Sequence, residues 1–347
     1  MGQKRITYFD MVKGLAIILV VLGHIEYISD PLRTWISSFH MPVFFVVSGM
    51  LIRYKNEQDL DLSESVRKKA KGILIPYFWF SLLYFFIDLI NVYRGEITSE
   101  IMLRDTISSL TFYGVSVLWF LPALFISEVL FLFLTKKFKP YISIPLIAVL
   151  AILSYVIQLL CGDFASAHSA SLLISALIDF MRVFLRGFIA TAFVMIAYYT
   201  FPLINKRESF SIWELIIGIF MFLVNLVLSQ INGCVDFHYI KENNVPLFYI
   251  CALLGSYSLI LICKNCKYLK PIGFFGKNSL VVMATHINTY VLYAAILISW
   301  QIDRIVTHAK SYIFIFNIMV LTFIFEAIII VIINRFFPFV LGKGKKK

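Results

Sequence analysis

The sequence has 347 residues, of which 60% are hydrophobic and only 15% are charged, and its formal net charge is +11. A soluble domain usually carries about a quarter charged residues, so this composition excludes an ordinary soluble protein. The apolar residues come in blocks of about twenty, long enough for a helix to cross the ~30 Å hydrocarbon core of a bilayer, which predicts an all-α, polytopic transmembrane helical bundle.

The first apolar block begins near residue 8 and contains Lys13 and His24. It lacks a small-residue cleavage site, so we expect a retained helix rather than a signal peptide. No loop is long enough to hold a soluble domain, and residues 1–347 are therefore predicted to form one transmembrane domain. In chain order, the ten predicted helices span residues 8–28, 35–53, 73–92, 117–135, 142–161, 183–203, 213–230, 245–263, 278–299 and 312–335.

Lysine and arginine are unevenly distributed among the segments between these helices. With ten helices, 22 of the 31 basic residues fall on the side that holds both termini. Positive charge accumulates on the cytoplasmic side of membrane proteins, so we expect cytoplasmic N- and C-termini in a multi-pass protein of the cell (inner or plasma) membrane. This topology signal accounts for the net charge without a nucleic-acid partner.

Three ionisable residues lie within the first predicted helix, where each costs a few kcal/mol to bury in lipid. Asp10 and Lys13 are three residues apart and can pair on one helix face. Lys13 and His24 are eleven residues apart, which places them on the same face, separated by roughly 16 Å along the axis. Lys13 alone could simply extend to the membrane surface, and His24 could cap the bundle. The alignment of the pair favours a functional face.

A basic cluster precedes the third predicted helix. It has two interpretations: an anchor that fixes the topology of the chain, or a site that binds phosphate groups. The sequence alone does not decide between them. The cluster consists of Arg67, Lys68, Lys69 and Lys71.

Four segments together resemble the membrane-bound acyltransferase 3 family. The first helix, with Lys13-Gly14 and Gly23-His24, resembles the opening signature of that family, a basic residue followed after ten intervening residues by a histidine. Similarity is greatest to the sugar O-acetyltransferase branch, which includes the fucose 4-O-acetylases. The family often has Arg-x-x-Arg before the third helix, which this chain lacks, so the ligands of a CoA phosphate stay open. The other three segments are 38–49, 118–124 and 276–286.

The resemblance implies transfer of an acyl group from cytoplasmic acyl-CoA to a hydroxyl of a cell-surface or lipid-linked saccharide, in a bacterial membrane and without a metal. Acetyl-CoA is the favoured donor, and succinyl-CoA is an alternative. His24 is expected to be the general base, since histidine titrates near neutrality, or to carry the acyl group transiently. His286 would stabilise the thioester carbonyl or position substrate. Asp10 is the third expected catalytic residue, beside His24 and His286. Lys13 and the basic cluster would bind the CoA.

Further polar residues inside the predicted spans are candidates for binding the acceptor, and each also has a structural interpretation. His40 could shape the acceptor site or cap a helix. Arg182 and Arg186 could bind an anionic or sugar group, or form an ion pair with Asp179. Glu128 and Glu326 each need a partner within the bundle. The complete set of acceptor-binding candidates is His40, Trp119, Glu128, Arg182 and Arg186.

Two other functions fit the same pattern of helices. A secondary transporter or exporter of a small sugar-like substrate would also need many spans and buried ionisable residues. It would show substrate flux without acyl-CoA. A non-catalytic scaffold with this fold would tolerate changes at His24. The sequence does not fix the acceptor or the oligomeric state.

Overall fold

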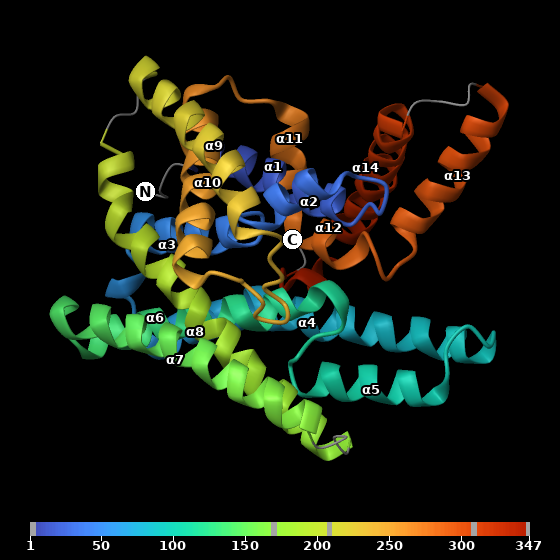
Figure 1. Ribbon diagram of the computed structural model, residues 1–347, viewed down its shortest axis with the longest axis horizontal. Coiled ribbons are helices and arrows are strands. Elements are labelled where there is room, and N and C mark those ends of the chain that lie inside the picture. The colour runs from blue at the N-terminus through green and yellow to red at the C-terminus, as the bar shows by residue number, and fades with distance from the viewer. Residues whose placement is uncertain (1–4, 168–171, 207–209, 307–310, 345–347) are drawn as a thin grey trace. The chain divides into compact units, whose positions relative to one another are not determined.

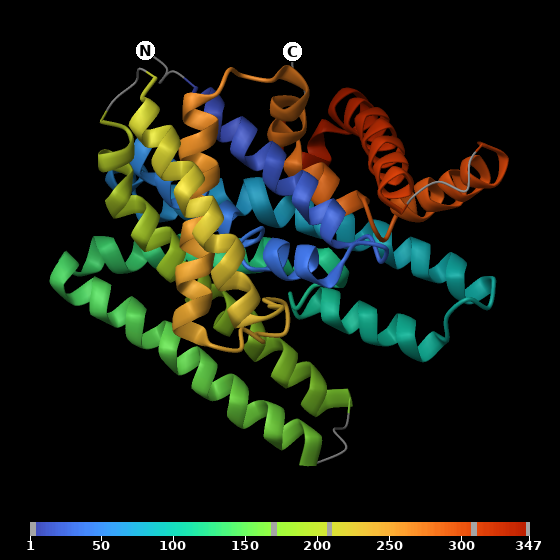
Figure 2. The same ribbon diagram turned by 45° about the horizontal axis from the view of Figure 1, so that its top comes forward.

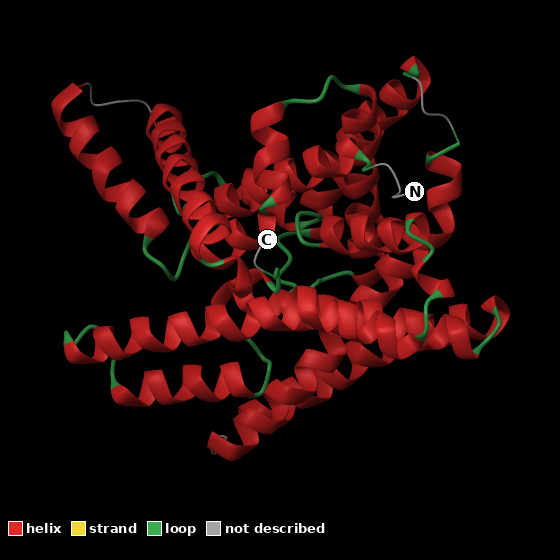
Figure 3. Ribbon diagram, turned by 180° about the vertical axis from the view of Figure 1, so that it is seen from behind, coloured by secondary structure: helices red, strands yellow, loops and turns green. Residues whose placement is uncertain are grey.

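The computed structural model describes residues 5–167, 172–206, 210–306 and 311–344, and these are overwhelmingly helical (Figure 3). Within those ranges there is no strand, only an isolated bridge between Asp236 and Lys241. The prediction of an all-α protein is therefore confirmed. The chain divides into two compact units, Met1–Val47 with Phe201–Arg335, and Ser48–Thr200 with Phe336–Lys347.

The first unit contains three histidines that are candidates for a functional site: His24, His40 and His286. α9 and α10 lie side by side in it as an antiparallel pair (Figures 1 and 2). Its elements are α1 (Thr7–Gly23), α2 (Asp30–Ser37), the start of α3 (Pro42–Tyr54), the end of α8 (Leu172–Ile204), α9 (Ile212–Asn232), α10 (Val245–Asn265), α11 (Lys270–Lys277), α12 (Ser279–Thr285), α13 (Val291–Val306) and α14 (Ser311–Phe336).

The second unit contains a long helix, α4, that packs against both α5 and α6. The turn from α4 into α5 uses Gly95 in the left-handed region, at φ +74°. Thr98 then caps α5 by accepting a hydrogen bond from the Ile101 N–H. The elements of this unit are the end of α3, η1 (Glu57–Asp59), α4 (Leu62–Tyr93), α5 (Ser99–Leu110), η2 (Ser116–Trp119), α6 (Phe120–Lys137), α7 (Pro140–Ala167), most of α8, and η3 (Pro338–Leu341).

Eight helices or helix pairs in the described part of the chain are long and apolar enough to cross a membrane. The protein is thus a multi-pass membrane protein, but three of the ten predicted spans differ. The span 35–53 is divided between α2, which ends at Ser37, and α3, which begins at Pro42. The span 8–28 is a helix of 17 residues that ends at Gly23. The span 278–299 is two helices, because α12 ends at Thr285 and α13 begins only at Val291, after Tyr290 with φ +62°. These last two breaks contain polar residues, Glu26 after α1 and Asn288 after α12, but these polar stretches are too short to divide an apolar block of about twenty residues.

α1 and α11 approach each other at backbone distance. A Cβ placed on Gly276 would lie 1.7 Å from the Asp10 carbonyl oxygen, and one placed on Gly14 would lie 2.1 Å from the Ile272 carbonyl oxygen. Only glycine fits at such contacts. These two glycines therefore set the distance between α1 and α11, and α11 leads directly into α12.

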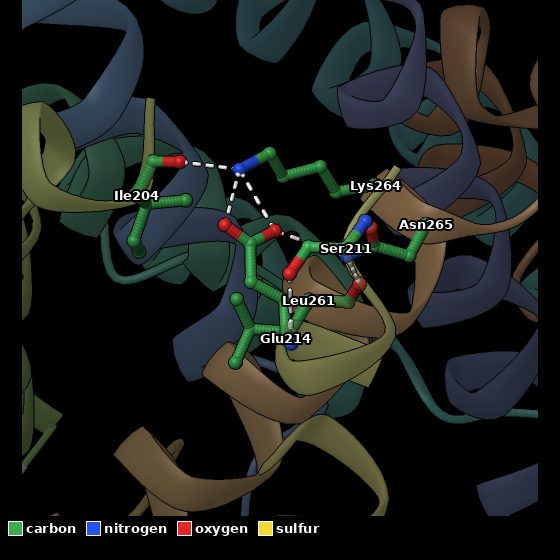
Figure 4. Close-up of polar contacts among 6 residues, drawn as sticks. All are labelled: Ile204, Ser211, Glu214, Leu261, Lys264 and Asn265. Carbon is green, nitrogen blue, oxygen red and sulfur yellow. Dashed lines mark hydrogen bonds and ion pairs between the residues drawn. The ribbon is translucent and has the colours of Figure 1, made fainter. Parts of the chain in front are cut away.

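A polar network ties together the end of α8, the start of α9 and the end of α10 (Figure 4). The Lys264 ammonium lies 2.9 Å from the Glu214 carboxylate and also donates to the Ile204 carbonyl. Asn265 accepts from the Ser211 N–H at 2.7 Å and donates to Glu214 at 3.0 Å. Because these groups satisfy one another, the three helix ends are held at one place.

Candidate functional site

His24 lies at the end of α1, as its C-terminal capping residue, and its side chain is exposed. The Arg33 guanidinium donates hydrogen bonds to the Gly23 carbonyl at 2.9 Å and to the Ile25 carbonyl at 3.0 Å. A cation at this position satisfies carbonyl groups that the helix end leaves open and is favoured by the helix dipole. Arg33 therefore fixes the turn that presents His24. No sequence pattern indicates this role, because the sequence shows Arg33 only as one charged residue between two predicted helices.

His286 is also the residue that follows the end of a helix, α12, and its side chain is fully buried. The centroid of its ring lies 5.3 Å from that of His24. Its Nδ1 lies 2.8 Å from the Val282 carbonyl and 3.1 Å from the Met283 carbonyl. Two carbonyl acceptors assign the proton to Nδ1, so Nε2 of the neutral ring is an acceptor. Within the described residues, Nε2 has no hydrogen-bond partner.

This tautomer changes the role available to His286. A neutral ring whose N–H is committed to the backbone cannot donate to a thioester carbonyl. It can only accept a hydrogen bond. The structure thus places the rings of His24 and His286 next to each other, a contact that the sequence does not predict. Of the two roles expected for His286, this tautomer favours the positioning of another group over the stabilisation of the thioester carbonyl, as long as the ring is neutral.

Glu326 supports the helix end next to His286. Both oxygens of its buried carboxyl group lie within hydrogen-bond distance of Thr285 Oγ1, at 2.9 and 2.8 Å, and share the single hydroxyl proton. The partner that the sequence required for Glu326 is thus a hydroxyl. The contact holds the last residue of α12 and, through it, the backbone that carries His286.

His40 lies between α2 and α3, and its Nδ1 is 2.8 Å from the Ile36 carbonyl. The ring therefore donates to the backbone, in agreement with the helix-capping interpretation. It is also close enough to His24 for the two rings to interact electrostatically. His40 is half-exposed and stays a candidate for contact with an acceptor.

Asp10 and Lys13 lie at the opposite end of α1 from His24. Asp10 is buried and accepts two hydrogen bonds from the Arg5 guanidinium, at 2.7 and 2.8 Å. Its carboxylate is 3.8 Å from the Lys13 ammonium, as the i, i+3 spacing predicts. Fourteen residues of helix separate Asp10 from His24, roughly 21 Å. Asp10 is thus an ion-pair partner of Lys13 and Arg5 and does not touch His24.

The basic cluster lies in the second unit, and its members differ in what they contact. Lys69 bridges two buried carboxylates, 2.7 Å from Glu57 and 3.1 Å from Glu128. Glu128 also accepts a hydrogen bond from the Ser48 hydroxyl. Burial raises the pKa of Glu57, but the charges of Lys69 and Lys68 outweigh it and hold the pKa below its usual value. Lys69 and Glu128 are therefore committed to an internal network.

The remaining basic residues of the cluster are exposed to solvent. Lys68 lies 3.3 Å from Glu57 and is half exposed, and no ion pair is recorded for Arg67 or Lys71 among the described residues. Gly342, from the C-terminal segment, packs against the Lys71 backbone, where a Cβ would lie 2.0 Å from its carbonyl oxygen. Gly342 thus lies beside the backbone of the basic cluster. No sequence motif indicates this contact.

Arg186 and Trp119 come together in the second unit. Arg186 is fully buried, donates to the Tyr113 carbonyl at 2.9 Å, and lies 4.2 Å from the Tyr113 ring and 5.5 Å from the Trp119 ring. Such contacts stabilise a cation in an apolar setting. Arg182 instead pairs with Asp179 at 3.2 Å, which supports the structural interpretation for that residue.

The loop between α9 and α10 contains a buried carboxyl group, that of Glu242. Neither carboxyl oxygen has a hydrogen-bond partner in the described part of the chain. Burial, and next the charge of Asp236, raise the pKa of Glu242 from 4.5 to about 9. The folded loop therefore holds Glu242 in its protonated form at neutral pH.

This buried carboxyl should make the protein less stable at higher pH. The unfolded chain releases the Glu242 proton near pH 4.5 and the folded chain near pH 9, so stability falls as pH rises between these values. Glu242→Gln should remove this loss, which is at most about 1.4 kcal/mol per pH unit. We expect the thermal midpoint of Glu242→Gln to exceed that of the wild type more at pH 8 than at pH 5. The same difference in thermal midpoint between the two proteins at pH 5 and at pH 8 would contradict a raised pKa for Glu242.

Comparison with known proteins gives a consistent result. An acyltransferase domain model matches residues 6–333. A nodulation protein, NolL, from Mesorhizobium japonicum is 30% identical over 148 residues, which cover 38% of this chain and 37% of that protein. NolL from Sinorhizobium fredii is 36% identical over 93 residues, 24% of this chain and 25% of its own length. The matched part is thus well under half of these relatives. No solved structure matches the chain.

Proposed function

Because the chain belongs to the acyltransferase 3 family, we propose that it is a membrane-embedded O-acyltransferase that uses cytoplasmic acyl-CoA, with acetyl-CoA as the favoured donor. The proposed acceptor is a hydroxyl of a cell-surface or lipid-linked saccharide. The observation that carries the proposal is an exposed His24 whose ring lies 5.3 Å from a buried, acceptor-type His286. The similarity to the two NolL proteins agrees with this family, and the acceptor remains part of the proposal.

In the proposed reaction, His24 removes the proton from the acceptor hydroxyl. The hydroxyl oxygen attacks the thioester carbonyl carbon, and the carbon–sulfur bond breaks. The His24 imidazolium then gives its proton to the CoA thiolate, so that ester and free CoA leave. General base catalysis of this kind contributes about 10²–10⁴ in rate. Transfer through an acyl-histidine on His24 is the alternative within the same function.

His286 has a positioning role in this proposal. One nitrogen of a neutral His24 carries a proton, and that N–H needs an acceptor if the other nitrogen is to serve as base. Nε2 of His286 is an acceptor whose own ring is fixed by the Val282 and Met283 carbonyls. The two rings form no such hydrogen bond in the structure, where Nε2 has no partner among the described residues. We infer that the bond forms in the reaction, when the exposed His24 ring turns its N–H toward Nε2, in the way a third group orients the base in hydrolase triads.

Basic residues would bind the phosphates of the donor. Lysine and arginine are the usual ligands of phosphate, and charge-assisted hydrogen bonds are stronger than neutral ones. Lys69 is not among the ligands that we propose, because its ammonium already pairs with Glu57 and Glu128. Arg67, Lys68 and Lys71 form one proposed group of phosphate ligands, and Lys13 is a separate proposed ligand.

Calorimetry with acetyl-CoA and the purified protein in detergent tests the donor assignment without knowledge of the acceptor. We expect saturable micromolar binding, weakened about tenfold in Lys13→Ala and in a Lys68→Ala/Lys71→Ala double variant. Lys139→Ala is the matched control, because Lys139 is an exposed basic residue of another loop. A folded wild type that binds neither acetyl-CoA, succinyl-CoA nor CoA would contradict the proposal and favour a transporter.

A further inference from the structure

The second unit contains a cavity that the proposed reaction does not use. It lies between α4 and α5, which run side by side (Figure 1), and its volume is about 450 Å³. Cavities of about 300–1,000 Å³ are typical of sites for small ligands. The lining is mainly aromatic and aliphatic, so the cavity suits a hydrocarbon group.

The two ends of this α4–α5 groove differ in chemistry. At one end the Tyr77 ring stacks on Phe112 at 5.4 Å, and its hydroxyl donates to the Ser109 carbonyl at 2.8 Å. At the other end Asp88 of α4 and Asp105 of α5 are close enough to interact electrostatically. Asp88 is eleven residues beyond Tyr77, so the ends are roughly 16 Å apart along α4.

The two aspartates have no hydrogen bond or ion pair recorded within the described ranges, although both side chains are half-buried. Burial raises the pKa of Asp105. A carboxyl group that keeps its proton more readily can both donate and accept hydrogen bonds, as hydroxyl groups do. The acidic end is therefore better matched to a hydroxyl-bearing group than to an anionic one.

We propose that the α4–α5 groove binds an amphiphile with one hydrocarbon chain along the apolar lining and a hydroxyl-bearing head at Asp88 and Asp105. The apolar length and the polar end match the two parts of such a molecule. The identification of this amphiphile as a lipid-linked saccharide acceptor rests on the proposed acyltransferase function. Binding itself does not.

A decyl glucoside with a photoreactive diazirine in its alkyl chain tests the groove, with the full-length protein in phospholipid nanodiscs. Peptide mapping after irradiation should locate the label on α4 and α5 residues that line the groove. Thr106→Trp fills the groove and should reduce labelling about tenfold. Leu103→Trp is the matched control, because Leu103 is 50% exposed on the same helix and does not line the groove. Equal labelling of both variants would overturn the proposal.

Substitution of the aspartates tests the nature of the head group. Asp88→Asn with Asp105→Asn keeps hydrogen-bonding groups and should retain most of the labelling, whereas Asp88→Leu with Asp105→Leu should lose it.

Competition by unlabelled compounds tests the same head group. Unlabelled decyl glucoside should reduce the labelling, and decylamine should not. Stronger competition by decylamine would instead identify a cationic head and overturn the proposal. Equal labelling by a photoreactive phosphatidylcholine, unaffected by the leucine variant, would identify ordinary bilayer lipid and overturn it as well. No acyl donor is present, so failure in this experiment is distinct from failure of the acyltransferase function.

Discussion

His24→Ala is expected to bind acetyl-CoA with near wild-type affinity and to lose acyl transfer by a factor of about 10²–10⁴. The side chain is exposed at the end of α1, and in the proposed reaction it acts on the acceptor hydroxyl and does not hold the donor. Transfer can be measured in membrane vesicles supplied with labelled acetyl-CoA, as base-labile acetate released from their saccharides. Donor binding by calorimetry shows in the same samples whether the variant is folded.

His286→Ala distinguishes a positioning residue from a second base. If Nε2 of His286 orients His24, its loss should lower the rate less than His24→Ala does and should shift the pH dependence of the remaining transfer. A double variant should be no worse than His24→Ala alone, because both act through one base. A folded His24→Ala protein with full transfer would remove His24 from the base role.

Gly276→Val is expected to disrupt the contact between α1 and α11. The new Cβ would lie 1.7 Å from the Asp10 carbonyl oxygen and 2.7 Å from the Gly14 amide nitrogen, and these backbone atoms cannot move independently of the helix. Overpacking of side chains typically costs about 1–3 kcal/mol, and a clash with backbone should reach at least the upper value. Transfer should fall as well, because α11 leads into α12 and hence to His286.

Gly72→Val is the matched control for this substitution. No heavy atom lies within 4 Å of a Cβ at Gly72, which also lies inside a helix, α4. Because valine is a somewhat better helix former than glycine, the substitution should change the free energy of unfolding by no more than about 0.5 kcal/mol, in the stabilising direction. The comparison can be made by thermal unfolding in detergent. Equal midpoints for Gly276→Val and Gly72→Val would show that α1 and α11 separate at no cost.

Much of the architecture was predictable from apolar blocks, because a membrane helix needs about twenty apolar residues in a row. Two of the predicted spans that differ contain the histidine pair: 8–28, whose helix ends at Gly23 just before His24, and 278–299, which is broken after Thr285. Irregular backbone within a membrane bundle needs other partners for its polar groups. Arg33 supplies them after α1, and no local pattern signals this, since Arg33 is ten residues from Gly23.

The candidate site was predictable where a short spacing carried the information. The pairing of Asp10 with Lys13 follows from i, i+3 geometry. A resemblance of motifs pointed to His24 and to His286 as candidates, but the contact between their rings comes only from the structure. The ion pair between Lys69 and Glu128 was not predictable. Glu128 is 59 residues away from Lys69, and only tertiary packing selects Lys69 rather than Lys68 for that contact.

The contact of Gly14 with α11 has a consequence for biogenesis. α9 and α10 are neighbours in the chain and can associate as soon as both are synthesised, whereas α1 must wait for α11, more than 250 residues later. Such long-range contacts form late, because the intervening chain must first be ordered. Until then α1 is inserted without its partner. We therefore expect the histidine pair to assemble only on the nearly complete chain, so that unfinished polypeptides carry no transfer activity.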